Sequence, residues 1–412
     1  MIPVEPANKP RPGIVLSGGG MRGAYEVGIM LGLMEVLERG ADDDPLFRVF
    51  AGTSVGAINA TFFAAHSHRG DHGVHRLRNI WGSLRIKDHV HVRAFGLVQW
   101  PERWRRLLGP LIDEQRGTSL IDARALEQIV QRSVDWEKLH ENVRAGRVSA
   151  LLIAALHVVS GRTTVFAELA PGFEYAPSPD HRRTLRYAEI EADHVLASAA
   201  IPLLFPTRLV SGQFYCDGGL RFNTPIAPAI RAGADRLVVV SVLRERSVTE
   251  AEIAESIAPA VGRDLSPFFL VGKLLNALLL DPVLYDLQVL ERVNQLVHVL
   301  EETLPPEHLE RVQSVLAGNR GIGYRRLRTL IFTPSEDLGK IAGAYVRTEL
   351  KTTDLHPVAR RLLEREARQD PGQEADWASY LLFDGGFAEQ IIELGRRDAH
   401  AKADAIKVFF AD

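Results

Sequence analysis

The sequence predicts an α/β fold of three layers, in which helices cover both faces of a mainly parallel central sheet. Short apolar runs typical of buried strands alternate with long helical segments through the first 245 residues. Such alternation is typical of parallel sheets whose strands are connected by helices. No fixed-period repeat is visible. The main predicted strands are residues 13–16, 48–50, 148–159, 237–242 and 327–332.

The first two predicted strands each lead through a glycine turn into an alanine- and leucine-rich segment, residues 24–38 and 57–66, that we expect to be helical. Ser160-Gly161 separates the third strand from another at 163–168, which predicts a hairpin. Leucines and valines recur at helical spacing from 284 to 300, and residues 387–394 have an amphipathic helical pattern. We therefore expect three parts, which are a core at 10–245, a helical insertion or lid packed on it at 246–325, and a C-terminal part at 326–412 with a strand returning to the core and terminal helices.

Composition and charge exclude some classes of function. The 412 residues carry a net charge of −3, which gives no basic face for nucleic acid, so we expect no nucleic-acid partner. The single cysteine, Cys216, cannot form an internal disulfide, and we expect it to be a small buried side chain. No segment reaches the roughly 20 apolar residues of a spanning helix. Residues 1–12, interrupted by prolines, do not match a secretory signal, so we expect a cytoplasmic protein.

Two segments are candidates for peripheral contact with a membrane. Residues 85–106 interleave Phe95, Trp100 and Trp104 with arginines, and residues 268–280 form an apolar helical run. Both patterns are also typical of segments that are buried in the core or against another subunit. Peripheral membrane association and a homo-oligomer are therefore alternatives that the sequence leaves open.

Two glycine motifs near the N-terminus together predict an acyl-transfer site. Gly18-Gly19-Gly20-Met21-Arg22-Gly23 follows the first strand and opens a helix, so its backbone N–H groups are suited to bind a negatively charged oxygen. Gly52-Thr53-Ser54-Val55-Gly56 follows the second strand and matches G-x-S-x-G, the sharp turn that presents a nucleophilic serine. Gly52 and Gly56 would allow helix and strand to make close contact. Ser54 is therefore the candidate nucleophile.

The first glycine motif also supports a different interpretation. Gly18, Gly20 and Gly23 match G-x-G-x-x-G, the fingerprint of dinucleotide-binding proteins. That fingerprint requires an acidic residue at the end of the second strand, whereas the aspartates at 42–44 precede that strand. A nucleotide-dependent oxidoreductase would also leave Ser54 without a role. It is the less favoured alternative, and we expect neither a cofactor nor a metal.

The residues alone leave the base that would activate Ser54 open. The 14 histidines include a polar cluster between residues 66 and 91, and none lies in a recognisable catalytic motif. Asp217, within Tyr215-Cys216-Asp217-Gly218-Gly219, is the other candidate, because apolar surroundings would raise its pKa toward neutrality. The same triplet recurs at Asp384-Gly385-Gly386, where we expect a structural turn.

At this point the chain resembles the patatin-like phospholipases. The matching blocks extend over residues 13–245, more than half of the chain, and the region that follows is similar to bacterial members with a helical extension. The blocks occur in the family's order, which makes them jointly specific. They are GGGMRG at 18–23, GTSVG at 52–56, SAAIPLLFPT at 198–207, DGG at 217–219 and Asn223-Thr224-Pro225.

The resemblance implies a serine lipid acyl hydrolase with a Ser–Asp dyad, in which Ser54 attacks an ester carbonyl and Asp217 is the general base. The expected substrates are phospholipids, lysophospholipids or other acyl-ester lipids. An inactive lipid-binding protein on the same fold is the main alternative. The resemblance also implies an oxyanion hole from Gly18, Gly19, Gly20 and Arg22, with motif support from Gly23, Gly52, Gly56, Gly218, Gly219 and Asn223.

Overall fold

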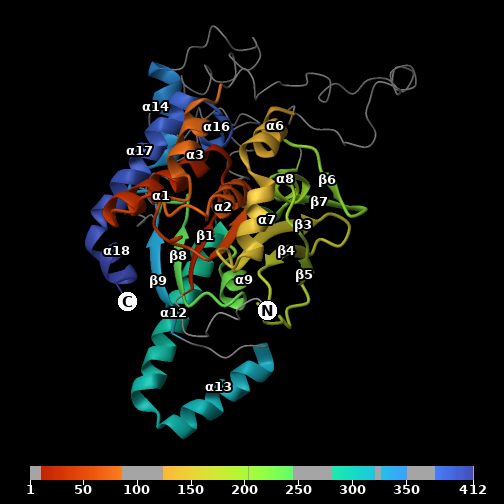
Figure 1. Ribbon diagram of the computed structural model, residues 1–412, viewed down its shortest axis with the longest axis vertical. Helices are drawn as coiled ribbons and strands as arrows, with labels where there is room; N and C mark the ends of the chain where they lie inside the picture. Colours follow the sequence, from red (N-terminus) through yellow and green to blue (C-terminus); the bar gives the residue numbers. More distant parts are fainter. Residues whose placement is uncertain are drawn as a thin grey trace, which may run out of the picture.

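A computed structural model describes residues 11–85, 124–202, 204–244, 281–320, 326–349 and 376–411 of the chain. Figure 1 shows a central sheet covered by helices on both faces, with one pair of helices extending away from it. This mixed α/β arrangement confirms the predicted fold class. The candidate membrane segments at 86–106 and 268–280 lie outside the described residues.

The described residues form a nine-stranded sheet. Seven of its strands lie in the order β5-β4-β3-β2-β1-β8-β9, and in addition β7 pairs with β3 and β6 pairs with β7. The pairs that include β1, β2 or β8 are parallel, and so is β4–β5, whereas β3–β4 is the expected antiparallel hairpin. The strands are β1 (Pro12–Leu16), β2 (Val49–Thr53), β3 (Ala150–His157), β4 (Thr163–Leu169), β5 (Arg183–Tyr187), β6 (Arg208–Val210), β7 (Gln213–Asp217), β8 (Arg236–Val240) and β9 (Arg328–Phe332).

Helices follow most of the strands, as the alternating pattern predicts. The two helices that follow the glycine motifs are α1 and α2, and a short 3-10 helix, η1 (Gly20–Gly23), precedes α1. The described helices are α1 (Ala24–Val36), α2 (Val55–Ala65), α3 (Val74–Gly82), α6 (Arg124–Ser133), α7 (Trp136–Arg144), α8 (Ala192–Ser198), α9 (Ile226–Arg231), α12 (Asp281–Thr303), α13 (Pro306–Arg320), α14 (Leu338–Thr348), α16 (Asp376–Leu381), α17 (Gly385–Ala401) and α18 (Ala403–Phe410).

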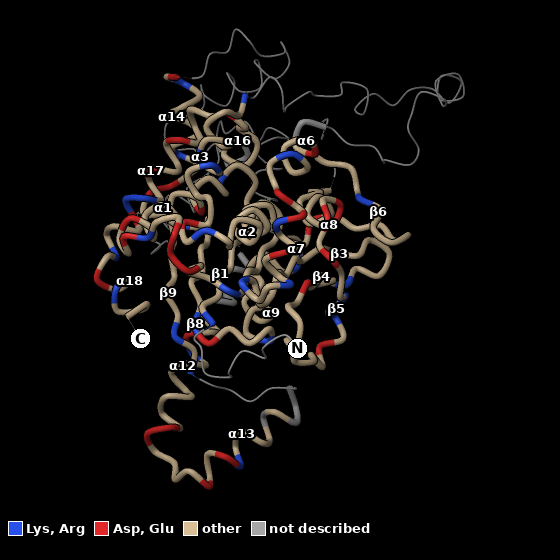
Figure 2. The backbone as a smooth tube through the Cα atoms, viewed as in Figure 1, with Lys and Arg blue, Asp and Glu red and all other residues tan. Residues whose placement is uncertain are grey.

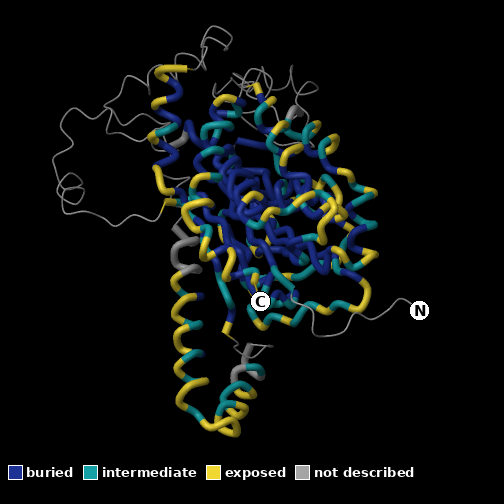
Figure 3. Tube along the Cα trace, turned by 60° about the vertical axis from the view of Figure 1, so that its left-hand side comes forward, coloured by how far each residue is buried: buried dark blue, intermediate teal, exposed yellow. Residues whose placement is uncertain are grey.

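The two faces of the sheet bury separate apolar layers. On β1, Ile14 and Leu16 belong to the larger core, with α1, α2 and α17, whereas Val15 belongs to a second core that includes residues of α9. Successive strand residues point to opposite faces, so one strand contributes to both layers. Figure 3 shows the resulting buried centre of the molecule. The sheet is therefore buried between two layers of helices.

Helix α1 is buried on nearly all sides because α17 packs along it. A Cβ on Gly28 would lie 2.1 Å from the carbonyl oxygen of Ile392, and a Cβ on Gly395 would lie 2.4 Å from that of Tyr25. The absence of side chains at these positions lets the two helix backbones approach closely. The amphipathic pattern at 387–394 thus marks a helix of the core, α17, which belongs to the C-terminal part of the chain.

Helices α12 and α13 extend away from the sheet as an antiparallel pair (Figures 1 and 3). The periodic pattern at 284–300 correctly predicts α12, but only part of that helix packs on the core. Leu290 joins the second core, and Asn294 exchanges two hydrogen bonds with the backbone of Leu327, whereas Leu296 and Val299 are exposed. None of the described helices is long and apolar enough to cross a membrane.

Candidate active site

Ser54 lies at the turn between β2 and α2, in a backbone conformation that few residues adopt. Its φ of 56° and ψ of −127° fall in a sparsely populated region, and such strain is often found at functional sites. Close contacts hold the turn in this shape, because a Cβ on Gly56 would lie 2.3 Å from the carbonyl oxygen of Leu16. A Cβ on Gly52 would lie 2.3 Å from the carbonyl oxygen of Gly56. The motif therefore forms the expected strand–turn–helix.

The sheet register brings Asp217 to the end of β2. Strand β2 ends with Thr53 paired to Ala154 of β3. On the same edge of β3, the next residue, Ala155, pairs with Asp217, the last residue of β7. Two strands from distant parts of the sequence thus end at adjacent positions. As a result, the Ser54 side chain reaches the Asp217 carboxyl, the pairing that the family resemblance implies.

The Asp217 carboxyl is fully buried, and burial raises its pKa to about 7, because the charged form loses its hydration. The Ser54 side chain and the backbone N–H of Gly219, which donates to Oδ1 at 2.7 Å, both act in the opposite direction and lower the pKa. Among the described residues, Oδ2 has no regular hydrogen-bond partner. The carboxyl therefore has one fixed oxygen and one oxygen that is able to accept a proton.

The first glycine loop lies directly against Ser54. A Cβ on Gly18 would lie 3.0 Å from Cβ of Ser54. The Gly18 amide donates to Asn223 Oδ1 at 2.9 Å, and Asn223 Nδ2 donates to the Gly18 carbonyl oxygen at 3.1 Å. Gly20 has a φ of +57°, and a Cβ there would lie 2.4 Å from the carbonyl oxygen of Tyr380. The loop is thus fixed on one side by Asn223 and on the other by α16.

The Arg22 side chain is buried and extends toward α16. Its Nε donates to Ser379 Oγ at 2.8 Å, and its guanidinium lies 4.2 Å from the centre of the Tyr380 ring. These contacts tie the glycine loop to the C-terminal part of the chain. This contact has no local signal in the sequence, because Ser379 and Tyr380 lie more than 350 residues after Arg22 and in no recognisable motif.

The other predicted site residues lie in the same region. Gly23 packs against Val55, so that a Cβ there would lie 2.4 Å from Cγ2 of the valine. Gly218 packs on β3, where a Cβ would lie 2.3 Å from the carbonyl oxygen of Ala154. The thiol of Cys216 is buried, and burial raises its pKa to about 12, so it is not a nucleophile at neutral pH.

The alternative catalytic groups have structural roles. Asp384 caps α17, since its carboxylate accepts from the Gly386 amide at 3.0 Å and from the Tyr345 hydroxyl at 2.5 Å. Buried His72 accepts from the Leu46 amide at 3.0 Å, and burial lowers its pKa to about 4. Within the described part of the chain, no cluster of side chains is suited to hold a metal ion.

Ser54 lines an apolar cavity. It is lined by residues of α2, α3 and α6, together with Ala199, Ile201 and Phe205 from the block after α8. The cavity wall is almost entirely hydrocarbon. The helical residues of the lining include Ile58, Phe62, Leu77, Trp81, Leu126 and Val130. The sequence does not mark the residues of α3 and α6 as cavity residues, because they show ordinary amphipathic spacing.

Ser198 is a site residue that sequence reasoning did not single out. Its hydroxyl accepts the backbone N–H of Ser54 at 2.8 Å and donates to the Ala154 carbonyl oxygen at 2.6 Å. The serine begins the SAAIPLLFPT block, which is the one available signal, but that block gives no indication which of its residues contacts the nucleophile.

Comparison with known proteins agrees with this geometry. The family model for patatin-like phospholipases matches residues 14–230, more than half of the chain. The chain therefore belongs to the patatin-like phospholipase family. A curated relative, the cGAMP-activated phospholipase of Pseudomonas aeruginosa, is 28% identical over 213 residues, which are 52% of this chain and 53% of the relative. The aligned region thus spans about half the length of that relative.

Two solved structures that resemble this chain are more distant in sequence. VipD from Legionella pneumophila is 13% identical with a TM-score of 0.35, and the alignment covers 93% of this chain and 67% of VipD. Human GIVD cytosolic phospholipase A2, in complex with methyl gamma-linolenyl fluorophosphonate, is 14% identical with a TM-score of 0.37, over 98% of this chain and 60% of the enzyme. Family membership rests on the family model, not on these two structures.

Proposed function

We propose that this protein is a serine lipid acyl hydrolase that cleaves carboxylic esters of phospholipids or lysophospholipids with a Ser54–Asp217 dyad. The observation that carries the proposal is the meeting of a strained, buried serine with a buried carboxyl of raised pKa, at the wall of an apolar cavity. A serine hydroxyl becomes nucleophilic only when a base accepts its proton. Asp217 is the residue that is placed to do so.

In the proposed reaction, Ser54 Oγ attacks the ester carbonyl while its proton passes to Asp217. The C–O bond to the alcohol then breaks, and Asp217 returns the proton to the leaving oxygen, which gives an acyl-enzyme. A water molecule then attacks the acyl carbonyl while Asp217 accepts its proton. The bond between the acyl carbon and Ser54 Oγ breaks, Asp217 returns the proton to Oγ, and a free fatty acid is released.

The oxyanion of each tetrahedral intermediate is assigned to the glycine loop. Because the Gly18 amide donates to Asn223, the amides of Gly19 and Gly20 are the proposed donors, and Gly18 positions them. Arg22 contributes a buried positive charge behind the loop, held by Ser379 and Tyr380. One oxyanion donor is typically worth about 100- to 1000-fold in rate.

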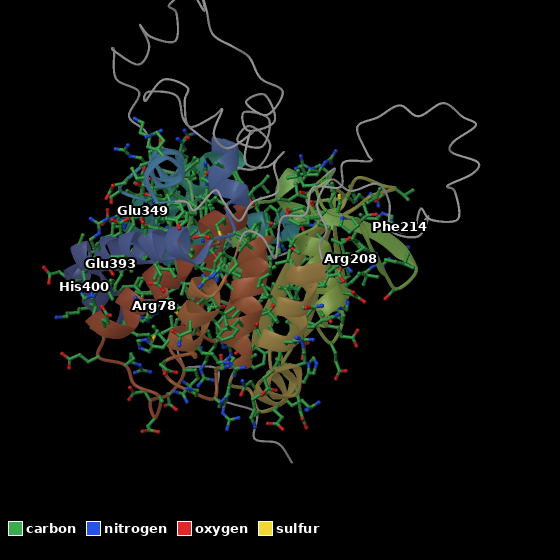
Figure 4. All side chains as sticks on the ribbon, turned by 90° about the horizontal axis from the view of Figure 1, so that it is seen from above. Arg78, Arg208, Phe214, Glu349, Glu393 and His400 are labelled. Carbon is green, nitrogen blue, oxygen red and sulfur yellow. The ribbon has the colours of Figure 1, made fainter. Side chains whose placement is uncertain are left out.

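Peripheral contact with a lipid surface is part of the proposal. Phe214 of β7 pairs with Leu209 of β6 and accepts the backbone N–H of Val158, which places the three side chains in one cross-strand row. All three are exposed, and Val159 beside them is 83% exposed. Residues 204–216 contain no acidic residue, and Arg208 of β6 (Figures 2 and 4) is ion-paired with Glu127 of α6. An exposed apolar row of this kind is suited to insert into a lipid surface.

The decisive experiment compares Ser54→Ala, Asp217→Asn and Asp384→Asn with the parent chain. We expect the first two to lose turnover of a butanoyl nitrophenyl ester and of phospholipid vesicles, and the third to retain it, since Asp384 is the matched aspartate of the second Asp-Gly-Gly triplet. A fluorophosphonate probe should label the parent at Ser54 and leave Ser54→Ala unlabelled. The assays are run with and without cGAMP, because the name of the curated relative states that cGAMP activates it.

The same data decide between the hydrolase and the inactive lipid-binding alternative. Full esterase activity in purified Ser54→Ala would exclude Ser54 as the nucleophile. A folded parent chain that neither reacts with the probe nor turns over any ester, with or without cGAMP, would favour the lipid-binding protein.

A further inference from the structure

The apolar cavity at Ser54 follows one helix, and this gives it a direction and a length. Ile58 and Phe62 both line it, four and eight residues after Ser54 on α2. At a rise of 1.5 Å per residue, these positions lie about 6 and about 12 Å along the helix from the nucleophile. Phe62 is the α2 residue of the lining that lies farthest from Ser54.

Helices α6 and α3 form the other two walls. Leu126, at the start of α6, packs with Ile201 and Phe205 near Ser54, whereas Val134 follows the end of α6. Helix α3 contributes Leu77 and Trp81. The cavity is therefore a channel between three helices, with Ser54 at one end of its α2 wall.

The far end of the channel is closed by an aromatic stack. The Phe62 ring lies 4.1 Å from the His66 ring with an interplanar angle of 18°, and Phe63 meets Phe62 edge-on. His66 is fixed in turn, because its Nδ1 lies 2.9 Å from the Phe62 carbonyl oxygen. Phe62 is only 1% exposed, so its ring is held from several sides.

The side wall is fixed by a buried polar network. Trp81 Nε1 donates to Asn59 Oδ1 at 3.3 Å, and Asn59 Nδ2 donates to Glu26 Oε2 at 2.8 Å and to the Gly23 carbonyl oxygen at 3.0 Å. The tryptophan's polar atom thus has a partner outside the channel. A wall held in this way keeps its shape, so the channel length is a property of the fold.

The geometry points to a chain-length limit: Phe62 is the specificity-determining residue that ends the acyl channel, and the enzyme prefers medium acyl chains. An extended chain advances roughly 1.2 Å per bond, as three backbone bonds span about 3.6 Å. A channel of about 12 Å therefore takes an acyl chain of about eight to ten carbons. This inference rests on the proposed hydrolase function and deepens it.

The test is a series of nitrophenyl esters from acetyl through butanoyl, octanoyl, decanoyl and dodecanoyl to hexadecanoyl. The kcat/KM of the parent chain should be highest for octanoyl or decanoyl and should fall at least tenfold by hexadecanoyl. Phe62→Ala should move the maximum to dodecanoyl or longer, since each further buried methylene contributes about fourfold. Phe47→Ala is the matched control, because Phe47 is also a fully buried phenylalanine but does not line the channel.

Ile58→Phe tests the opposite direction and does not depend on the folding of Phe62→Ala. A larger side chain one turn from Ser54 should lower turnover of the octanoyl ester at least tenfold more than turnover of the acetyl ester. An unchanged profile in both Phe62→Ala and Ile58→Phe, with short esters still turned over, would overturn the limit at Phe62.

A binding measurement separates failure of this inference from failure of the proposed chemistry. Ser54→Ala, which needs no catalytic activity, should bind decanoate more tightly than hexadecanoate in isothermal titration. Adding Phe62→Ala should reverse that preference. If hexadecanoate binds Ser54→Ala as tightly as decanoate does, the channel does not end at Phe62, whatever the ester assays show.

Discussion

The backbone N–H of Ser54 donates to the hydroxyl of Ser198 at 2.8 Å, and that hydroxyl donates onward to the carbonyl oxygen of Ala154. Ala154 precedes Ala155, the residue that pairs with Asp217. One buried hydroxyl therefore connects the turn that carries the nucleophile to the strand that positions the proposed base. Loss of the Ser198 hydroxyl would therefore change the distance between Ser54 and Asp217.

Ser198→Ala should therefore impair catalysis more than its small volume change suggests. It leaves the Ser54 amide and the Ala154 carbonyl without their partner, and an unsatisfied buried group costs about 1–3 kcal/mol. We expect kcat/KM for a butanoyl ester to fall about 10- to 100-fold, within that range. Ser67→Ala is the control, since Ser67 is equally buried and donates to the Phe63 carbonyl away from the site. Equal activities in the two variants would contradict the positioning role.

Asn223 should act on the oxyanion loop in the same indirect way. Its side chain exchanges two hydrogen bonds with Gly18, and Asn223→Ala removes both. We expect kcat to fall at least tenfold with little change in KM, because the loop amides would lose their fixed orientation. Asn142→Ala removes another buried asparagine side chain, one that bonds the carbonyls of Ala64 and Ala65. That control should lose stability but keep kcat.

The sequence predicts the strands and the nucleophile turn well, because these depend on local pattern. Ser54 is predicted from a spacing of glycines that only a sharp strand–turn–helix requires. The meeting of Ser54 with Asp217 depends instead on register, with β2 and β7 ending at adjacent positions on one edge of β3. Only the family resemblance anticipated that contact. Sequence spacing alone leaves a histidine as an alternative candidate for the base.

Other parts of the site depend on contacts that leave no local trace. Arg22 binds Ser379 across most of the chain, and α17 packs on α1 through glycines whose role is not visible in either segment alone. The acyl channel combines one face each of α2, α3 and α6, and each face reads as ordinary core. Hydrophobic spacing shows that a face is buried but not what it faces.

Activity should rise with pH through neutrality. The proposed base works only as a carboxylate, and burial raises the Asp217 pKa to about 7. The kcat/KM for a butanoyl ester should therefore increase about tenfold per pH unit below that value and level off above it. The rate of fluorophosphonate labelling should show the same midpoint. Full activity at pH 5 would mean that a group other than Asp217 accepts the proton.

Stability should change with pH in the opposite direction. Between the ordinary carboxyl pKa of 3.8 and about 7, the folded state holds a proton on Asp217 that the unfolded state has lost. The free energy of unfolding therefore falls as pH rises through this window, by up to roughly 4 kcal/mol in total. Asp217→Asn has no carboxyl group to ionise at this position, so it should not lose stability in this pH window. Its unfolding free energy from urea titration should match the parent near pH 4 and exceed it at pH 8, and a constant difference at all pH values would contradict the raised pKa.

The apolar row of Val158, Leu209 and Phe214 should matter only when the substrate lies in a bilayer. Phe214→Ser removes an exposed ring whose burial in lipid would contribute about 1.5–3 kcal/mol, so turnover of anionic phospholipid vesicles should fall about tenfold or more. Turnover of a soluble butanoyl ester should not change, because Phe214 is absent from the cavity lining. Val408→Ser on α18 is the control, since Val408 is 65% exposed and lies outside the row. If the two variants bind and cleave vesicles equally, the β6–β7 hairpin is not the docking surface, and membrane contact must come from another part of the chain.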